Sequence, residues 1–184
     1  MGNIIFSDFE IYSKVDQLTR EKYSSQLPEE LLSFWDTHGF GSILDGYLKV
    51  INPDFYIEFL QQSYFRGQVS IPIFTTSIGE VITWEKNQFL GKIDYPHGKF
   101  DIISDGFDFF FSDILDHSFM KNNFLLNEYS SAKKIHGKVL YDECFGYVPL
   151  LALGGRDSVE SLQKCKLYEH LQLIFSFIGK IGDN

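Results

Sequence analysis

The clearest periodic pattern of apolar positions lies at the C-terminal end of the chain. Leu171, Ile174, Phe175 and Ile178 recur at the three- and four-residue spacing of one helix face. Gly179 follows where helices often end, because glycine readily adopts the left-handed conformation of a helix C-terminus. The pattern predicts an amphipathic helix that ends at Gly179.

Two earlier helices are predicted by their start and stop signals. The first runs from about residue 28 to residue 38, with Pro28 in its first turn and Gly39 as its stop. The second begins with Asn52 as N-cap and Pro53 at the first helical position. Both helices place aromatic side chains on the face that we expect to be buried.

The middle of the chain has the short β-rich runs and turn residues of an antiparallel sheet. Residues 70–111 predict this sheet: one hairpin turns at residues 77–79, and two more short strands flank the turn dipeptide Asp105-Gly106. A helical turn capped by Ser112 is expected to follow.

The order of these elements predicts an α+β fold, with an antiparallel sheet and flanking helices. From about residue 120 the chain becomes helical again, with a helix closed by Gly137, a strand and the C-terminal helix. We therefore expect two closely packed subdomains, residues 1–119 and residues 120–184.

Aromatic residues are more frequent than a core of this size obviously needs. The 184 residues include 19 Phe, 10 Tyr and 2 Trp. Two interpretations stay open: the core is rich in phenylalanine, or some rings lie on the surface as binding anchors.

The charge balance excludes one class of partner and favours another. The chain has 25 Asp and Glu against 16 Lys and Arg, a net charge of −9, and no basic stripe. A polyanion is repelled by such a surface, so we expect no direct nucleic-acid binding, whereas a basic protein is attracted.

No targeting or membrane segment is expected. Asp8 and Glu10 come too early for a signal peptide, Phe6 stands where a myristoylation motif needs Ser or Thr, and no apolar run approaches the length of a membrane helix. These features predict a cytoplasmic protein with reduced thiols.

The segment "YDECFGYVPLLALGG", residues 141–155, combines carboxylates, a thiol and a glycine pair. Asp142, Glu143 and Cys144 would need a base, and only the fold could bring His136 or His170 near. An inert, buried cysteine on a strand is the commoner case, although Pro149 favours an edge or a bulge in that strand. We expect a structural segment.

No cofactor or metal is expected from the remaining motifs. The Gly154-Gly155 pair lacks the spacing of a phosphate-binding loop, and Cys144 and Cys165 match no zinc pattern. Asp113 and His117 could share a helix face, but one pair is too few ligands for a metal. Catalytic residues are likewise not expected.

The strongest candidate for a functional surface is an acidic tract interleaved with aromatic rings. Between residues 92 and 116, six aspartates stand against two lysines. The tract fits either a binding surface with a charged rim and apolar anchors, or hairpin turns with the phenylalanines in the core. The expected partner-binding residues are Tyr95, Asp101, Asp105, Phe107, Asp108, Asp113 and Asp116.

Several segments together resemble a known bacterial family. They are "LPEELLSFWDTHGFGS" (27–42), "NPDFY" (52–56), "IPIFTTSIGEVITWE" (71–85), and "ECFGYVPLLALGG" (143–155) with "SVESLQKCKLYEHLQLI" (158–174). In order and spacing they resemble a GAD-like domain joined to the C-terminal domain of type VI secretion immunity proteins. The resemblance runs from about residue 27 to residue 179.

The resemblance implies a non-enzymatic immunity protein that binds and neutralises a cognate secreted toxin, typically a deoxyribonuclease. A basic nuclease domain would then be the partner, and the tract above would block its active site or substrate cleft. Two other classes of function stay open: an enzyme acting on a nucleotide or a toxin-modified substrate, and a small-molecule-binding module.

Overall fold

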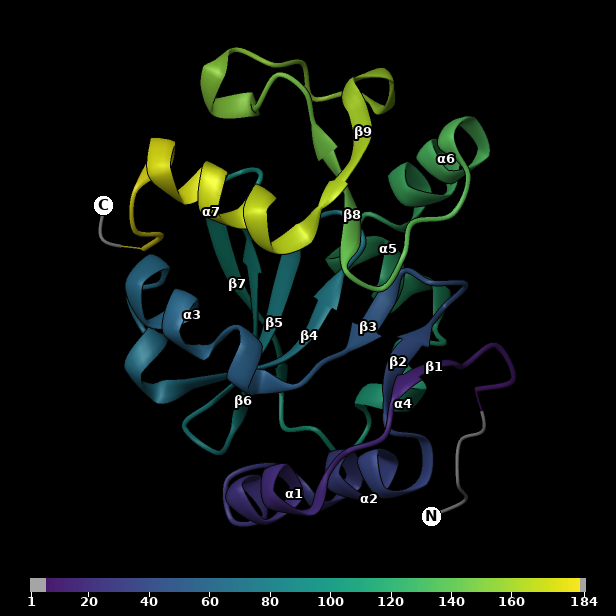
Figure 1. Ribbon diagram of the computed structural model, residues 1–184, viewed down its shortest axis with the longest axis vertical. Helices are drawn as coiled ribbons and strands as arrows, with labels where there is room; N and C mark the ends of the chain where they lie inside the picture. Colours follow the sequence, from purple (N-terminus) through teal and green to yellow (C-terminus); the bar gives the residue numbers. More distant parts are fainter. Residues whose placement is uncertain (1–5, 183–184) are drawn as a thin grey trace.

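The computed structural model describes residues 6–182 and has an α+β fold, as the sequence predicts. Residues 1–5, on which the expectations about N-terminal targeting partly depend, lie outside the described residues. One sheet has seven strands that follow each other in sequence order, and every neighbouring pair is antiparallel (Figure 1). The strands are β1 (Glu10–Ser13), β2 (Phe40–Ile43), β3 (Leu48–Val50), β4 (Ser70–Thr76), β5 (Glu80–Glu85), β6 (Phe89–Asp94) and β7 (Lys99–Asp105).

Helices and a small second sheet surround this large sheet. The second sheet is the antiparallel pair β8 (Glu143–Tyr147) and β9 (Leu162–Lys166). The helices are α1 (Gln17–Tyr23), α2 (Glu29–His38), α3 (Ile57–Ser63), α4 (Phe110–Asp113), α5 (His117–Asn123), α6 (Leu126–His136) and α7 (Leu167–Ile178). Short 3-10 turns occupy Pro53–Phe55, Gly67–Val69, Leu151–Leu153 and Val159–Ser161.

Two apolar clusters cover the two faces of the large sheet. Val81 and Ile82 are neighbours on β5 and therefore point to opposite faces, and each belongs to a different cluster. Buried side chains of α2, α4, α5 and α6 join the cluster that contains Ile82, and those of α3 and α7 join the other. In Figure 1, α3 and α7 accordingly lie apart from α1 and α2.

Most of the predicted elements are confirmed. The helix expected from residue 28 is α2, the C-terminal helix is α7, and the first hairpin is formed by β4 and β5. Gly39, Gly137 and Gly179 end their helices with positive φ angles of 84°, 75° and 73°. The side chain of Asn52 accepts a hydrogen bond from the Asp54 amide at 3.0 Å, but the turn it caps is a short 3-10 turn that precedes α3.

The expected hairpin around Asp105-Gly106 is wrong. The strands β6 and β7 pair through a turn at residues 95–98 instead, and the chain after Gly106 passes through a turn into α4, which begins at Phe110. The reason is the spacing of three buried rings: Phe107, Phe110 and Phe111 follow the i, i+3, i+4 pattern of a helix face.

Two smaller expectations also differ from the structure, and the chain opens with two elements that no sequence pattern predicted, β1 and α1. Ser112 lies within α4, and the residue that caps the following helix is Asp116, whose carboxylate accepts a hydrogen bond from the Phe119 amide at 2.8 Å. The strand β8 ends at Tyr147, before a cis peptide bond to Pro149. The boundary expected near residue 120 falls within α5, and the division into two subdomains there stays a prediction.

A buried ion pair lies inside the sheet. Glu80 on β5 is fully buried and accepts hydrogen bonds from the hydroxyls of Tyr47 (3.0 Å) and Thr76 (2.8 Å). The ammonium of Lys92 on β6 lies 3.4 Å from the other carboxylate oxygen. Burial raises the pKa of Glu80, and the charge of Lys92 opposes that rise. The charge of Lys92 therefore offsets part of the cost of burying this carboxylate.

Replacing Lys92 by methionine is expected to destabilise the fold by roughly 3–5 kcal/mol at neutral pH, because a buried carboxylate then loses its cation. The folded-state pKa of Glu80 rises above its unfolded value, so the native state binds the extra proton. Stability of the variant should therefore fall as the pH rises above about 4.5, the ordinary value for this group. Urea denaturation between pH 4.5 and pH 8 measures this.

The control for that experiment is Lys99→Met, which removes an exposed cation from β7. The second change Glu80→Gln in the Lys92→Met background should abolish most of the added pH dependence. If Lys92→Met is no less stable than Lys99→Met at pH 8, the ion pair does not have the role assigned to it.

Candidate functional site

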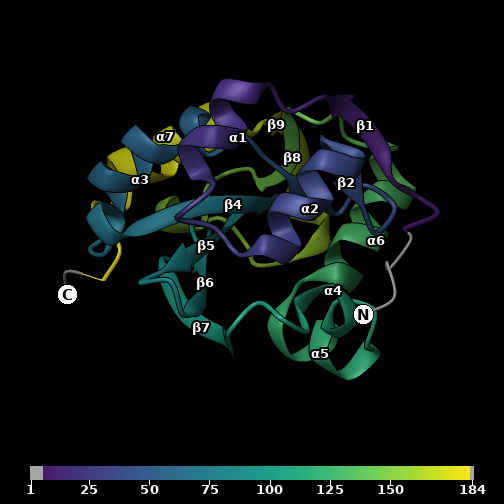
Figure 2. The same cartoon turned by 90° about the horizontal axis from the view of Figure 1, so that it is seen from below.

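The five predicted aspartates follow one another from the edge of the sheet to α5. Asp101 and Asp105 lie on β7, an outer strand of the sheet; Asp108 lies before α4. Asp113 ends α4 and Asp116 caps α5. Asp113 is half-buried and the other four are exposed. We call these five residues the acidic strip, and Figure 2 shows β7, α4 and α5 in succession along one side of the molecule.

The structure does not place the two predicted aromatic anchors on the surface. Tyr95 has an exposure of 0%, and its hydroxyl forms a 2.7 Å hydrogen bond with Ser63. Phe107 has an exposure of 1% and packs against Phe74 and Phe111. Both rings are held in the core because apolar neighbours surround them, so neither can meet a partner.

Other apolar side chains of the same segment are exposed instead. Phe109 has an exposure of 68%, Leu115 of 57% and Ile102 of 44%. Sequence reasoning missed all three, although a signal for Phe109 was available: it falls outside the i, i+3, i+4 spacing of its buried neighbours. The acidic strip therefore includes exposed apolar groups among its charges, and binding surfaces commonly combine an apolar centre with a polar rim.

A sixth carboxylate belongs to this surface. Burial and the nearby charge of Asp108 raise the pKa of Glu30, which lies in the first turn of α2. The two carboxylates repel each other, since like charges raise each other's proton affinity. The repulsion between Glu30 and Asp108 therefore lowers the stability of the isolated protein while it concentrates negative charge on this part of the surface.

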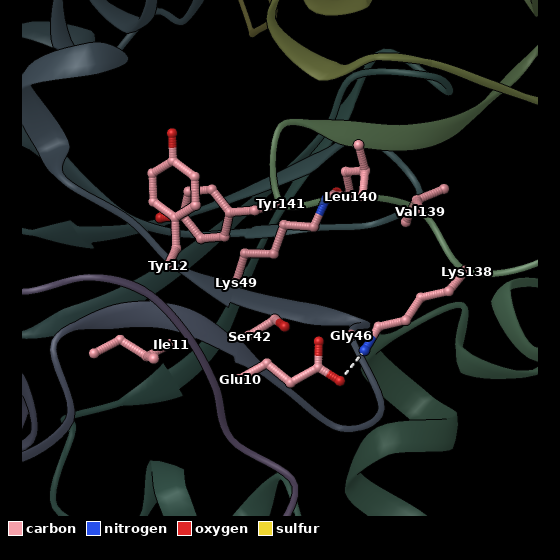
Figure 3. A pocket seen from close by; sticks show the side chains of 10 residues that line it. All are labelled: Glu10, Ile11, Tyr12, Ser42, Gly46, Lys49, Lys138, Val139, Leu140 and Tyr141. Atoms are coloured by element: carbon pink, nitrogen blue, oxygen red, sulfur yellow. Dashed lines mark hydrogen bonds and ion pairs between the residues drawn. The ribbon is translucent and has the colours of Figure 1, made fainter.

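A second exposed region lies where β1 meets the segment that precedes β8. The rings of Tyr12 and Tyr141 stack with their centroids 4.0 Å apart and an interplanar angle of 10°. The Tyr141 hydroxyl donates a 2.7 Å hydrogen bond to the Val50 carbonyl. Figure 3 shows the two rings overlapping beside a cavity of about 180 Å³. Ile11 and Leu140 extend its apolar rim into solvent.

The charged groups of this cavity are already partnered. Lys138 pairs with Glu10, as the dashed line in Figure 3 marks. Lys49 is 1% exposed and donates hydrogen bonds to the carbonyls of Leu140 (3.1 Å) and Glu143. Burial lowers the pKa of Lys49 to about 8. The cavity can therefore accept an apolar side chain, but it offers no free acid or base.

The segment at 141–155 has no nucleophile at Cys144. That thiol is fully buried, and a hydrogen bond with Cys165 together with burial raises its pKa well above the ordinary value. The carboxylate of Asp142 instead pairs with Lys166 at 2.7 Å. The ring of His136 packs against Phe145, whereas His170 lies beside Cys165, a neighbour that sequence spacing did not indicate.

Within residues 6–182, no group of three or more His, Cys, Asp or Glu side chains is arranged to hold a metal ion. Asp113 and His117 do not share a helix face, because α4 ends at Asp113 and α5 begins at His117. His97 forms hydrogen bonds with Asp94 (2.8 Å) and Asp157 (3.2 Å), and the Asp94 bond raises its pKa. This histidine ties the turn between β6 and β7 to the loop before β9.

Two family models match the chain, one in each half. Residues 6–94 match the GAD-like domain family, and residues 104–178 match the family "T6SS immunity protein Tdi1, C-terminal". The chain carries the domains of a type VI secretion system immunity protein. Such a protein neutralises a toxin, and a role of this kind needs no catalysis by the immunity protein itself.

The crystal structure of Atu4351 from Agrobacterium tumefaciens has the same fold. The two proteins are 16% identical and superpose with a TM-score of 0.72, over 92% of this chain and 88% of that one. No curated protein sequence matches the immunity protein described here. Among residues 6–182, no helix is long and apolar enough to cross a membrane.

Replacing Asp108 by asparagine is expected to lower the pKa of Glu30, because one of the two causes of its elevation is removed. The stability of the isolated protein at neutral pH should stay the same or rise slightly. An NMR titration of the glutamate side-chain carboxyl carbons measures the pKa. Asp101→Asn, on β7, removes the same charge and should leave Glu30 unchanged. Equal effects of the two variants would contradict a local repulsion.

Proposed function

We propose that this immunity protein neutralises a cognate deoxyribonuclease-type toxin by placing the acidic strip in the toxin's DNA-binding cleft. The observation that supports this most is the exposure of Asp101, Asp105, Asp108 and Asp116 on consecutive elements of one segment. The family matches support the immunity role, and the chemistry of the strip suggests the class of toxin.

A nuclease must bind the phosphates of its substrate, so its cleft carries Lys, Arg or a metal ion. Carboxylates on an inhibitor can occupy the same positive potential. The net charge of −9 also accelerates encounter with a basic partner, by about tenfold or more at low salt. The same charge repels DNA, so substrate does not compete for the inhibitor.

Charge alone gives rapid association and not a long-lived complex, since most differences in affinity lie in the dissociation rate. Exposed apolar side chains at the centre of an interface supply that second contribution. Phe109 and Leu115 lie within the acidic strip and are exposed enough to enter a pocket on the toxin. We assign them the anchoring role that Tyr95 and Phe107, as core residues, cannot have.

Changing the five aspartates of the strip to asparagine is expected to slow association with the toxin by about tenfold or more at low ionic strength. The toxin is first recovered by affinity capture from the producing bacterium and identified by its DNA cleavage. Stopped-flow kinetics at several salt concentrations then give the association rate and its salt dependence, and a DNA cleavage assay gives the inhibition.

The control variant removes the same number of charges from elsewhere on the chain. It carries Gln at Glu21, Glu58, Glu128, Glu160 and Glu169. Both variants have the same net charge, so only a local effect distinguishes them. If the two variants associate equally fast, the acidic strip is not the contact surface. If the captured toxin cleaves no DNA, the proposed toxin class is wrong while the immunity role stands.

The single change Phe109→Ala is expected to raise the dissociation rate roughly 30-fold, the loss typical of a central anchor, with little change in the association rate. Leu18→Ala is the matched control, because Leu18 on α1 is an equally isolated exposed side chain, at 79% exposure. Surface plasmon resonance measures both rates. Equal dissociation rates for the two variants would place the anchor elsewhere.

A further inference from the structure

The two cysteines of the chain face each other across the hairpin formed by β8 and β9. Cys144 pairs directly with Cys165 in the antiparallel register. Both are free thiols, and their sulfur atoms are 3.5 Å apart. Sequence spacing separates them by 21 residues, so the proximity arises from the fold.

The backbone positions suit a covalent bond between these sulfurs. The Val148 amide donates to the Ser161 carbonyl and the Leu167 amide to the Asp142 carbonyl. Alternation along the ladder therefore makes Cys144 and Cys165 a hydrogen-bonded pair, with Cα atoms about 5.5 Å apart. This value lies inside the range of about 4.4–6.8 Å that disulfides span. Closing the bond needs side-chain rotation and no rearrangement of the strands.

His170 on α7 lies beside Cys165, and Gly146 makes room for it. A Cβ atom at Gly146 would come within 2.3 Å of the imidazole Nε2 and 2.8 Å of the Cys165 sulfur. The Nε2 atom is buried and has no hydrogen-bond partner within the described residues. The imidazole therefore faces the sulfur without being committed to another group.

The two thiols have opposite character. A hydrogen bond from the Cys144 thiol and the neighbouring imidazole of His170 lower the pKa of Cys165 to about 5. The pKa of Cys144 is raised, although the charge of Lys49 on β3 opposes the rise and that of Glu143 on β8 adds to it. These directions favour ionisation of Cys165 over ionisation of Cys144. Cys165 is also partly exposed, whereas Cys144 is buried.

We propose that Cys144 and Cys165 form a reversible oxidation site, in which Cys165 reacts with a peroxide and Cys144 closes a disulfide across the hairpin. The contact between one partly exposed sulfur, which a peroxide can reach, and one buried sulfur, which it cannot, assigns the order of the two steps. This site is independent of the acidic strip and of the identity of the toxin.

The chemistry balances with hydrogen peroxide as the oxidant. The Cys165 sulfur attacks one oxygen, the O–O bond breaks, and the departing hydroxide takes a proton to leave as water, which gives a sulfenic acid. The Cys144 sulfur then loses its proton and attacks the sulfenic sulfur. The S–O bond breaks, a second water leaves and the S–S bond forms. Two electrons pass from the thiols to the peroxide, and a low-molecular-weight thiol reverses the change.

The test exposes the folded full chain to hydrogen peroxide at pH 7 and maps the products by mass spectrometry. The proposal predicts a loss of about 2 Da and a Cys144–Cys165 peptide within one chain. In Cys144→Ser, the sulfenic acid on Cys165 should persist and be trapped by dimedone. Cys165→Ser should leave Cys144 unmodified. Two thiols that stay reduced while a denatured sample is oxidised, or disulfides only between chains, would overturn the proposal.

Two further measurements use the wild-type chain. The rate of iodoacetamide reaction at Cys165 should follow a titration near pH 5, and a separate comparison with His170→Gln should show that titration moved upward. An inflection near the ordinary cysteine value of about 8.5 would contradict a lowered pKa at Cys165. The oxidised protein should also melt roughly 5–10 °C higher than the reduced one, because the bond restricts the unfolded chain. An unchanged or lower melting temperature would contradict a bond that fits the native hairpin.

Discussion

The packing of three phenylalanines under the acidic strip determines where its charges can lie. Phe107, Phe110 and Phe111 are buried, and Phe111 stacks on Phe34 of α2 with ring centroids 4.9 Å apart. Phe110 lies 5.3 Å from Phe74 of β4. These contacts fix the chain between β7 and α5 against the sheet, so Asp108, which lies between the rings, faces solvent. The packing of the three phenylalanines therefore both stabilises the core and keeps the neighbouring carboxylate of Asp108 at the surface.

The second half of the chain is attached by polar and ionic contacts as well as by apolar ones. Lys49 on β3 donates to the carbonyls of Leu140, before β8, and of Glu143, the first residue of β8. The Phe145 amide donates to the Ser77 carbonyl. The ring of Phe145 belongs to the same buried cluster as α2. The thiol pair lies in the hairpin that these contacts hold in place. A disulfide there would reinforce an element that already positions the C-terminal helix.

The sequence was informative wherever a local rule decides the structure. Gly39 and Gly179 mark helix ends because the backbone there has a positive φ, and residues 77–79 mark a turn between two strands. It was not informative where tertiary contacts decide. Gly106 follows the last strand of the sheet and begins no hairpin, because the phenylalanines after it pack as a helix face.

On the candidate surface, too, tertiary contacts that the sequence does not show decide which side chains are exposed. Composition located the aspartates of the strip, but it could not separate exposed rings from buried ones: Tyr95 and Phe107 proved to be core, and Phe109 is exposed. His170 lies beside Cys165 because α7 packs over the β8–β9 hairpin. No residue spacing in the sequence predicts this packing.

Hydrogen–deuterium exchange of the immunity protein, alone and in complex with its captured toxin, tests the central claim most directly. If the acidic strip enters the toxin, amide exchange slows on complex formation in peptides covering β7, α4 and α5. Exchange at β1 and residues 138–142 then stays as in the free protein. Protection confined to β1 and residues 138–142, with none between residues 99 and 123, would contradict the proposed contact.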